Sequence, residues 1–271
     1  MPPPKLNDAL FNFISATPTP FHAVANLGCI LQGAGFTILH ENQEWQIEPE
    51  GRYALIRNGS LIAFTTGSGD FHREGFRLLG AHTDSPSLQL KPHPRAPSSP
   101  YLQFSVEKYG GALLNTWFDR ELSLAGRVTV LAESGAACSC LIDFQEPVLY
   151  VPSLAIHLDR KANEGREINV QNDLSPVLAQ SVSSEEQWHA LLLDRINTLN
   201  DDLTARSVLG YDLFCYDCSP PRFFGLDKKF ICGPRLDNLL SCFIGLQALL
   251  DKDNTCLLYT SDAADDWLVG V

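Results

Sequence analysis

The sequence carries little positive charge and has no basic cluster, which narrows its possible partners. Only 20 of its 271 residues are Lys or Arg, against 32 Asp or Glu, so the formal net charge is -12. A nucleic-acid-binding face needs grouped Lys and Arg side chains to neutralise phosphates. We therefore expect no nucleic-acid partner, and we interpret the acidity as a solvated surface that favours solubility.

Long apolar runs are also missing. No stretch approaches the roughly 20 consecutive apolar residues of a membrane-spanning helix, so we expect no membrane partner. The N-terminal segment Met1-Pro-Pro-Pro-Lys5 lacks the features of a secretory signal. The eight cysteines follow no disulfide-framework spacing. The pair Cys215 and Cys218 could belong to a zinc knuckle or a redox motif, but it has no matching second pair. Free thiols in a reducing cytoplasm are the preferred interpretation.

Several common catalytic motifs are absent. The sequence contains no Gly-x-Ser-x-Gly elbow of a serine hydrolase, no Gly-x-x-x-x-Gly-Lys-Ser/Thr phosphate loop and no His-Glu-x-x-His zinc helix. Its composition is nevertheless that of a folded protein, because 45% of the residues are hydrophobic and 19% are charged. A chain of 271 residues can form one large domain or two smaller ones.

Two proline-rich seams divide the chain. They span residues 91–100 and 219–222, and such stretches often mark domain boundaries because proline lacks the backbone donor of regular structure. The predicted stretches are 1–91, 92–222 and 223–250, followed by a tail over 251–271.

The first stretch alternates helical and strand patterns, which predicts an α/β fold. Asn58 and Gly59 indicate a hairpin turn, since both residues tolerate positive φ. A run ending at Gly80 is expected to form a buried strand that leads directly into His82. The predicted helices and strands are 6–14, 24–31, 53–57, 61–65 and 76–80.

The middle stretch is predicted to be rich in strands, for example over 127–131 and 147–151, with helical signal confined to 184–203. The third stretch opens with a short apolar segment over 230–232. Apolar residues then recur at helical spacing over 239–250 and predict a helix.

The segment His82-Thr-Asp84 lies where the predicted strand stops, and ligand sites of open α/β sheets gather at such strand ends. A histidine there can offer a ring nitrogen to zinc. A carboxylate two residues later can orient the imidazole as a second-shell partner. A polar turn with a capping aspartate is the alternative.

Asp237 also lies between a predicted strand and a helix. A carboxylate in this position can bridge two cations. It can equally cap the helix, alone or through Asn238, and the local sequence fits both interpretations. His157 stands within an apolar run, a pattern that is typical of a buried structural histidine.

The order and spacing of several motifs carry more information than any one of them. Together they resemble the M18 (aspartyl aminopeptidase) family over residues 6–250. The motifs are Pro18-Thr-Pro-Phe-His22, Gly80-Ala-His-Thr-Asp-Ser-Pro86, Tyr109-Gly-Gly111, Leu114-Asn-Thr-Trp-Phe-Asp-Arg120, Leu122-Ser-Leu-Ala-Gly-Arg127, Pro152-Ser-Leu-Ala-Ile-His-Leu-Asp-Arg160 and Pro234-Arg-Leu-Asp-Asn238.

The resemblance implies an α/β fold class, in which a zinc-peptidase-type sheet domain, incomplete here, is interrupted by an inserted β-rich dimerisation domain. It implies that His82 is a metal ligand, that Asp84 is its orienting carboxylate in the catalytic centre, and that Asp237 bridges two Zn2+ ions. It implies that His157 reaches a neighbouring subunit's active site, near metal and substrate. The implied protein is a cytoplasmic homo-oligomer built from dimers that removes N-terminal, possibly acidic, residues from peptides.

The sequence departs from the family after Asp237. The family's paired glutamates, a further metal-binding aspartate and a last metal-binding histidine lie downstream of this helix, whereas no Glu follows Glu186 here. We therefore expect this chain to be a truncated form without peptidase activity. Residues 256–265 resemble the translated read-through of a sequencing adaptor, so we expect the tail over 251–271 to be non-native. The alternatives are a non-catalytic assembly module of the same family and another co-catalytic zinc hydrolase, such as a deacylase.

Overall fold

A computed structural model describes residues 4–69, 75–94, 101–180, 185–199, 203–251 and 258–261. The chain forms two compact units. The first unit combines Met1–Ser85 with Pro220–Val271, and the second comprises Pro86–Ser219. The chain thus leaves the first unit and returns to it, at positions close to the two proline-rich seams. Within the described residues, no helix is both long and apolar enough to cross a membrane.

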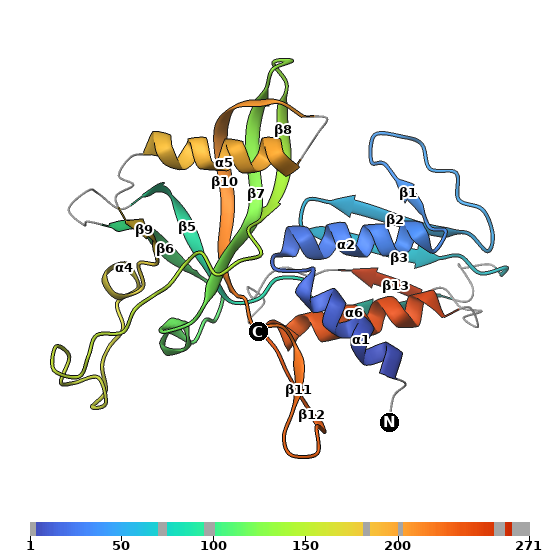
Figure 1. Ribbon diagram of the computed structural model, residues 1–271. Coiled ribbons are helices and arrows are strands. Elements are labelled where there is room, and N and C mark those ends of the chain that lie inside the picture. The colour runs from blue at the N-terminus through green and yellow to red at the C-terminus, as the bar shows by residue number, and fades with distance from the viewer. Residues whose placement is uncertain are drawn as a thin grey trace, which may run out of the picture. The chain divides into compact units, whose positions relative to one another are not determined.

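The first unit is built on a mixed five-stranded sheet with the strand order β1-β2-β3-β13-β4. Parallel pairing joins β1 to β2 and β13 to β4, whereas β2–β3 and β3–β13 are antiparallel. Figure 1 shows α2 running along β2 and β3, with α1 beside α6. The strands are β1 (Thr37–Leu39), β2 (Arg52–Arg57), β3 (Ser60–Thr65), β4 (Arg77–Gly80) and β13 (Leu258–Ser261), and the helices are α1 (Pro4–Ser15), α2 (Pro20–Gly33) and α6 (Leu236–Leu250).

Local sequence explains how these elements begin and turn. Thr19 lies in the extended region and its hydroxyl accepts a hydrogen bond from the backbone N–H of His22, while Pro20 occupies the first turn of α2. The β2–β3 turn places Asn58 at a φ of 53°, as the hairpin signal predicted. A separate two-stranded hairpin pairs β11 (Arg222–Phe224) with β12 (Phe230–Cys232).

A buried apolar cluster joins the helices of the first unit to its sheet. Its members come from α1, α2, β2, β3 and α6, with Phe36 from the loop after α2, and they bury the apolar faces that the helical spacing predicted. The fully or almost fully buried members include Ile14, Ala23, Val24, Leu31, Ala54, Ala63 and Leu239.

The second unit is an antiparallel six-stranded sheet with the order β8-β7-β10-β5-β6-β9. Helix α5 (Glu185–Leu199) lies across its β8–β10 region (Figure 1) and buries Trp188, whose ring centroid is 4.8 Å from that of Phe104. The strands are β5 (Ser87–Pro94), β6 (Tyr101–Tyr109), β7 (Leu122–Ala132), β8 (Ala137–Asp143), β9 (Val177–Gln180) and β10 (Ala205–Asp217), with the short helices η1 (Leu114–Trp117) and α4 (Val170–Asp173).

Two strand predictions need correction. The side chains of Phe76 and Leu78 are 61% and 69% exposed, because β4 is the edge strand of the described sheet and only alternate side chains face α6. Residues 147–151 form no strand and make only two isolated bridges, through Leu149 and Tyr150. Prolines at both ends of this segment remove the donors that a longer ladder needs.

Candidate metal centre

The candidate site forms where the end of β4 meets the start of α6. After Gly80 the chain leaves β4 without regular secondary structure, and Thr83 is buried, with its hydroxyl donating to the carbonyl oxygen of Gly59 (3.2 Å). Its neighbours His82 and Asp84 are less buried, with side chains 39% and 25% exposed. The contact between the His82 ring and the Asp84 carboxylate shows that both candidate side chains lie on the same side of this segment.

The His82 imidazole is held by the residue that the sequence paired with it. Its Nδ1 lies 3.1 Å from Asp84 Oδ1 and 3.1 Å from the Asp84 carbonyl oxygen. Both partners are acceptors, so this arrangement favours a proton on Nδ1. The lone pair of Nε2 is then available on the opposite side of the ring.

That free side of the ring faces Asp237. His82 Nε2 lies 3.5 Å from Asp237 Oδ1, although the two residues are far apart in sequence. The Asp237 side chain is 94% exposed, so it is open to a ligand from solvent. The structure therefore brings together three of the predicted site residues: His82, Asp84 and Asp237.

The predicted helix cap at Asp237 or Asn238 is wrong. The cap position of α6 is Arg235, which adopts a left-handed conformation with a φ of 57° and makes no side-chain cap hydrogen bond. Asp237 and Asn238 have non-helical backbone angles, and the peptide bond between them is cis. Because the backbone turns away from the first helical turn here, the Asp237 carboxylate points toward His82 rather than toward the helix amides.

Two reciprocal hydrogen bonds tie the two segments together. Ser85 Oγ donates to the carbonyl oxygen of Asp237 (3.1 Å), and Cys242 Sγ donates to the carbonyl oxygen of His82 (3.2 Å). Neither residue was predicted to belong to the site, because Ser85 was matched only as part of the motif Gly80–Pro86 and Cys242 was interpreted only as a free thiol. A side chain from each segment therefore holds the backbone of the other beside the metal-binding candidates.

The donor set fits zinc. Two ligands that each lie about 2.0–2.1 Å from a tetrahedral zinc ion are separated by about 3.3–3.4 Å. The observed 3.5 Å between His82 Nε2 and Asp237 Oδ1 is close to this value. In the described part of the chain, no three or more His, Cys, Asp or Glu side chains are placed so that they could together hold a metal ion, and Asp84 contacts the imidazole of His82 on the side away from Asp237. The pair thus supplies two candidate ligands and not a full coordination shell.

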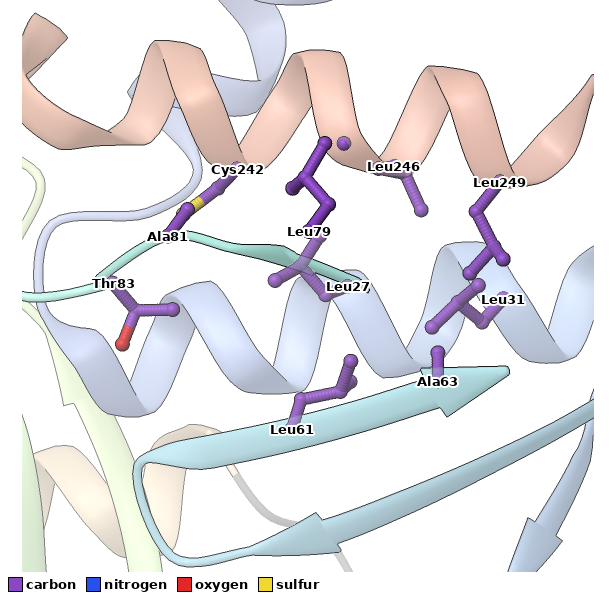
Figure 2. A pocket seen from close by; sticks show the side chains of 11 residues that line it. Leu27, Leu31, Leu61, Ala63, Leu79, Ala81, Thr83, Cys242, Leu246 and Leu249 are labelled. Carbon is purple, nitrogen blue, oxygen red and sulfur yellow. The ribbon is translucent and has the colours of Figure 1, made fainter. Parts of the chain in front are cut away.

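A small apolar cavity lies next to Thr83, the residue between His82 and Asp84, and next to Cys242, which bonds to the backbone of His82 (Figure 2). It measures about 40 Å³, and Thr83, Ala81 and Cys242 line one end of it. Apolar side chains from α2, β3, β4 and α6 line the rest, namely Leu27, Leu31, Leu61, Ala63, Leu79, Leu246 and Leu249. Apart from Thr83 and Cys242, whose polar atoms donate to the carbonyl oxygens of Gly59 and His82, this lining offers no polar group that could orient a peptide.

His157 belongs to the second unit and lies on an irregular segment before α4. The prediction of a buried structural histidine is wrong, because His157 is exposed and its apolar neighbours Leu154, Ile156 and Leu158 are 55%, 47% and 75% exposed. An exposed apolar cluster of this kind is typical of an interaction surface.

Comparison with known proteins identifies what the chain is similar to. Residues 13–264 match the family model described as aminopeptidase I zinc metalloprotease (M18). The "Probable M18 family aminopeptidase 2" of Stutzerimonas stutzeri is 50% identical over 262 residues, which cover 95% of this chain and 61% of that protein. The protein of the same name from Pseudomonas aeruginosa strain LESB58 is 48% identical, with the same coverage. The chain therefore spans 61% of the length of these curated relatives.

Several solved structures share the fold of this chain. The structure of the Ape4 and Nbr1 complex matches with a TM-score of 0.88 at 34% identity, covering 95% of this chain and 54% of that one. The structure of Chaetomium thermophilum mApe1 matches with a TM-score of 0.83 at 26% identity, covering 97% and 66%. A structure titled as the S. cerevesiae mApe1 dodecamer shares the fold, with a TM-score of 0.72 at 23% identity and coverage of 94% and 59%.

Proposed function

Because the chain belongs to the M18 family of aminopeptidase I zinc metalloproteases, we propose that it forms the part of a zinc-dependent aminopeptidase that carries His82, Asp84 and Asp237. The observation that supports this most strongly is the 3.5 Å approach of His82 Nε2 to Asp237 Oδ1, with Nδ1 held by Asp84 on the other side of the ring. The substrate would be the N-terminal residue of a peptide.

Each residue has a separate role in this proposal. His82 would bind one zinc ion through Nε2, and Asp84 would keep the proton on Nδ1 and fix the ring orientation. Asp237 would use its two carboxylate oxygens to bridge two ions. Bound zinc would supply Lewis-acid activation of water and of the scissile carbonyl. Ser85 and Cys242 would keep the two ligand-bearing segments at the required separation.

By resemblance to the family, the general base of such a reaction would be a glutamate downstream of Asp237. No Glu follows Glu186 in the 271 residues of this chain. We therefore expect the 271-residue chain by itself to have no peptidase activity, and we assign the activity to the protein expressed from its complete gene.

His157 would act on a second copy of the chain. This part of the proposal is supported by its exposed position between Leu154, Ile156 and Leu158, whose apolar side chains would be covered in a dimer. Dimers would then assemble into a larger homo-oligomer; S. cerevesiae mApe1, which shares the fold, is a dodecamer.

We extend the proposal to an N-terminal Asp or Glu as the preferred residue and to the cytoplasm as the compartment. The preference is supported only by the motif resemblance, since an acidic chain has no electrostatic advantage with acidic peptides. The compartment is supported by the free thiols of all seven cysteines in the described part of the chain. Cys256 lies outside that part.

Activity measurements on the complete gene product test the proposal. We expect zinc-dependent release of an N-terminal residue that is lost in His82→Ala and Asp237→Asn, and reduced about 10–100-fold in Asp84→Ala. The exposed His40 supplies a matched control, because His40→Ala removes an imidazole of the same unit away from the pair. Full activity in His82→Ala would contradict the proposal.

A second candidate function is assembly without catalysis. The second unit has its own buried core, which includes Phe104 and Trp188, and it carries the exposed cluster around His157. Sedimentation of the 271-residue chain tests this candidate, because a strict monomer excludes it.

A further inference from the structure

The segment that carries His157 has little order of its own. It spans residues 152–168, hereafter the His157 loop, and contains no helix or strand. Its internal hydrogen bonds are those of successive turns, such as Leu158 N–H to the Ala155 oxygen (2.8 Å) and Glu164 N–H to the Lys161 oxygen (2.8 Å). Irregular loops of this length sample many conformations unless other parts of the protein hold them. The contacts at its two ends therefore decide where His157 lies.

Asp119 holds the first end. Its backbone N–H donates to the carbonyl oxygen of Val151 (2.9 Å), and its carboxylate Oδ1 accepts from Ser153 N–H (2.9 Å) and from the Tyr150 hydroxyl (3.3 Å). Asp119 has a φ of 55°, a left-handed conformation, and its amide and its carboxylate both bond to the short segment 150–153. The hydrogen bond from Ser153 N–H is the main cause of the lowered pKa of Asp119.

Arg166 holds the second end. Its guanidinium bridges two carboxylates, with Nη1 3.1 Å from Asp159 and Nη2 3.4 Å from Asp173 of α4. The same guanidinium lies over the ring of Phe118, 5.2 Å from its centroid. The side chains of Arg166, Asp159 and Asp173 are only 24%, 19% and 27% exposed, so solvent screens these pairs less than it screens an ordinary surface ion pair.

The adjacent residues Phe118 and Asp119 therefore contact both ends of the His157 loop. Phe118 supports Arg166, while its neighbour Asp119 binds Ser153, on the other side of His157 in sequence. These two residues come from the motif Leu114-Asn-Thr-Trp-Phe-Asp-Arg120, which the proposed chemistry leaves without a role. We propose that Phe118, Asp119 and Arg166 are positioning residues that hold the His157 loop in one conformation and so set where His157 reaches. This inference rests on the proposed function in which His157 acts on a second copy.

The 271-residue chain allows a direct test. The variants are Asp119→Ala and Arg166→Gln, with Arg166→Lys as the conservative replacement and Arg160→Gln as the control. Arg160 is an exposed arginine of the same loop. Lysine carries the same charge but presents a single point donor, which cannot bridge two carboxylates in the way that a guanidinium does.

Amide hydrogen exchange reports whether the loop is held. We expect exchange over the His157 loop to accelerate at least about tenfold in Asp119→Ala and Arg166→Gln, partly in Arg166→Lys and not in Arg160→Gln. Exchange in β7 and α5 should stay unchanged, which separates loop release from loss of the fold. If the loop amides of both Asp119→Ala and Arg166→Gln exchange at the wild-type rate, the proposal is overturned.

The Cε1–Hε1 NMR signal of His157 reports on position more specifically. In Asp119→Ala and Arg166→Gln this signal should shift and sharpen, whereas the signal of His189 on α5 should not move. An unmoved His157 signal would also overturn the proposal.

Sedimentation of the same variants separates this inference from the proposed function. If the wild-type chain is a monomer, the proposed action of His157 on a second copy is contradicted. Amide hydrogen exchange still tests independently whether the loop is anchored. If the wild type dimerises, both releasing variants should dissociate at least about tenfold more readily.

Discussion

The hydroxyl of Ser85 donates a 3.1 Å hydrogen bond to the carbonyl oxygen of Asp237, which lies 152 residues further along the chain. Cys242 makes the reciprocal bond from α6 to the carbonyl oxygen of His82. These two bonds join the segments whose side chains meet at the candidate metal centre. The geometry of that centre therefore depends on residues that would not themselves touch a metal ion.

Removing the Ser85 hydroxyl should loosen this connection. We expect Ser85→Ala to lower the free energy of unfolding by about 0.5–1.5 kcal/mol, with the lower end favoured because the bond is exposed to water. Urea denaturation measures the change, and the exposed Ser68 provides a matched control in Ser68→Ala. Equal stability losses in the two variants would show that the bond to Asp237 contributes nothing.

Gly126 should tolerate no side chain. A Cβ atom there would fall on the carbonyl oxygen of Asp212 and lie 2.9 Å from the Cα of Leu213, both in the neighbouring strand β10. We expect Gly126→Ala to destabilise the second unit by about 1–3 kcal/mol or more. Gly210 of β10 is the control, since an added Cβ meets nothing within 4 Å, and Gly210→Ala should change stability by less than about 1 kcal/mol. The prediction fails if the two variants melt alike.

The thiols should react in an order set by burial. Burial raises the pKa of the Cys218 thiol to about 11 and raises that of the fully buried Cys215 as well. The thiolate is the reactive form, so iodoacetamide at pH 8 should modify the exposed Cys29 and Cys232 first, Cys218 slowly, and Cys215 only after unfolding. Mass spectrometry of peptides gives the order. Early modification of Cys215 would contradict the described core.

The hold of Asp119 on the His157 loop should weaken in acid. The pKa of Asp119 is lowered in the folded protein, chiefly by the hydrogen bond from Ser153 N–H. Its contribution is therefore present above the unfolded-state value near 3.8 and disappears as the pH falls through the lower folded-state value.

The ratio of loop exchange rates in Asp119→Asn and wild type measures this contribution. It should exceed one at pH 6 and fall toward one as the pH is lowered below the unfolded-state value of 3.8 and through the lower folded-state pKa. Taking the ratio at each pH cancels the titration of other carboxylates and the intrinsic pH dependence of exchange. A ratio that stays constant with pH would show that the Asp119 charge does not hold the loop.

Local sequence signals predicted the local features of the fold. The Asn58–Gly59 turn and the helical spacing after Asp237 correspond to the β2–β3 hairpin and to α6. These features depend on the φ preferences and the periodicity of a few adjacent residues. Spacing alone does not distinguish an apolar segment that is buried in a core from one that is exposed on a surface, which explains the errors for Leu78 and for the residues around His157.

The candidate site was predictable only in part. The pairing of His82 with Asp84 was predicted from their two-residue spacing after a strand, and the structure has the two side chains in contact. The approach of Asp237 is a long-range contact, and its local sequence indicated a helix cap instead. Asp237 and Asn238 have non-helical backbone angles at the start of α6, and no pattern in a single sequence reveals this conformation.

Zinc-specific anomalous scattering from crystals of the complete gene product tests the central claim most directly. The predicted result is an anomalous peak in contact with both His82 Nε2 and the Asp237 carboxylate, with Asp84 on the opposite side of the imidazole. The peak should disappear in His82→Ala. A zinc peak bound by other side chains, with His82 and Asp237 free of metal, would contradict the account.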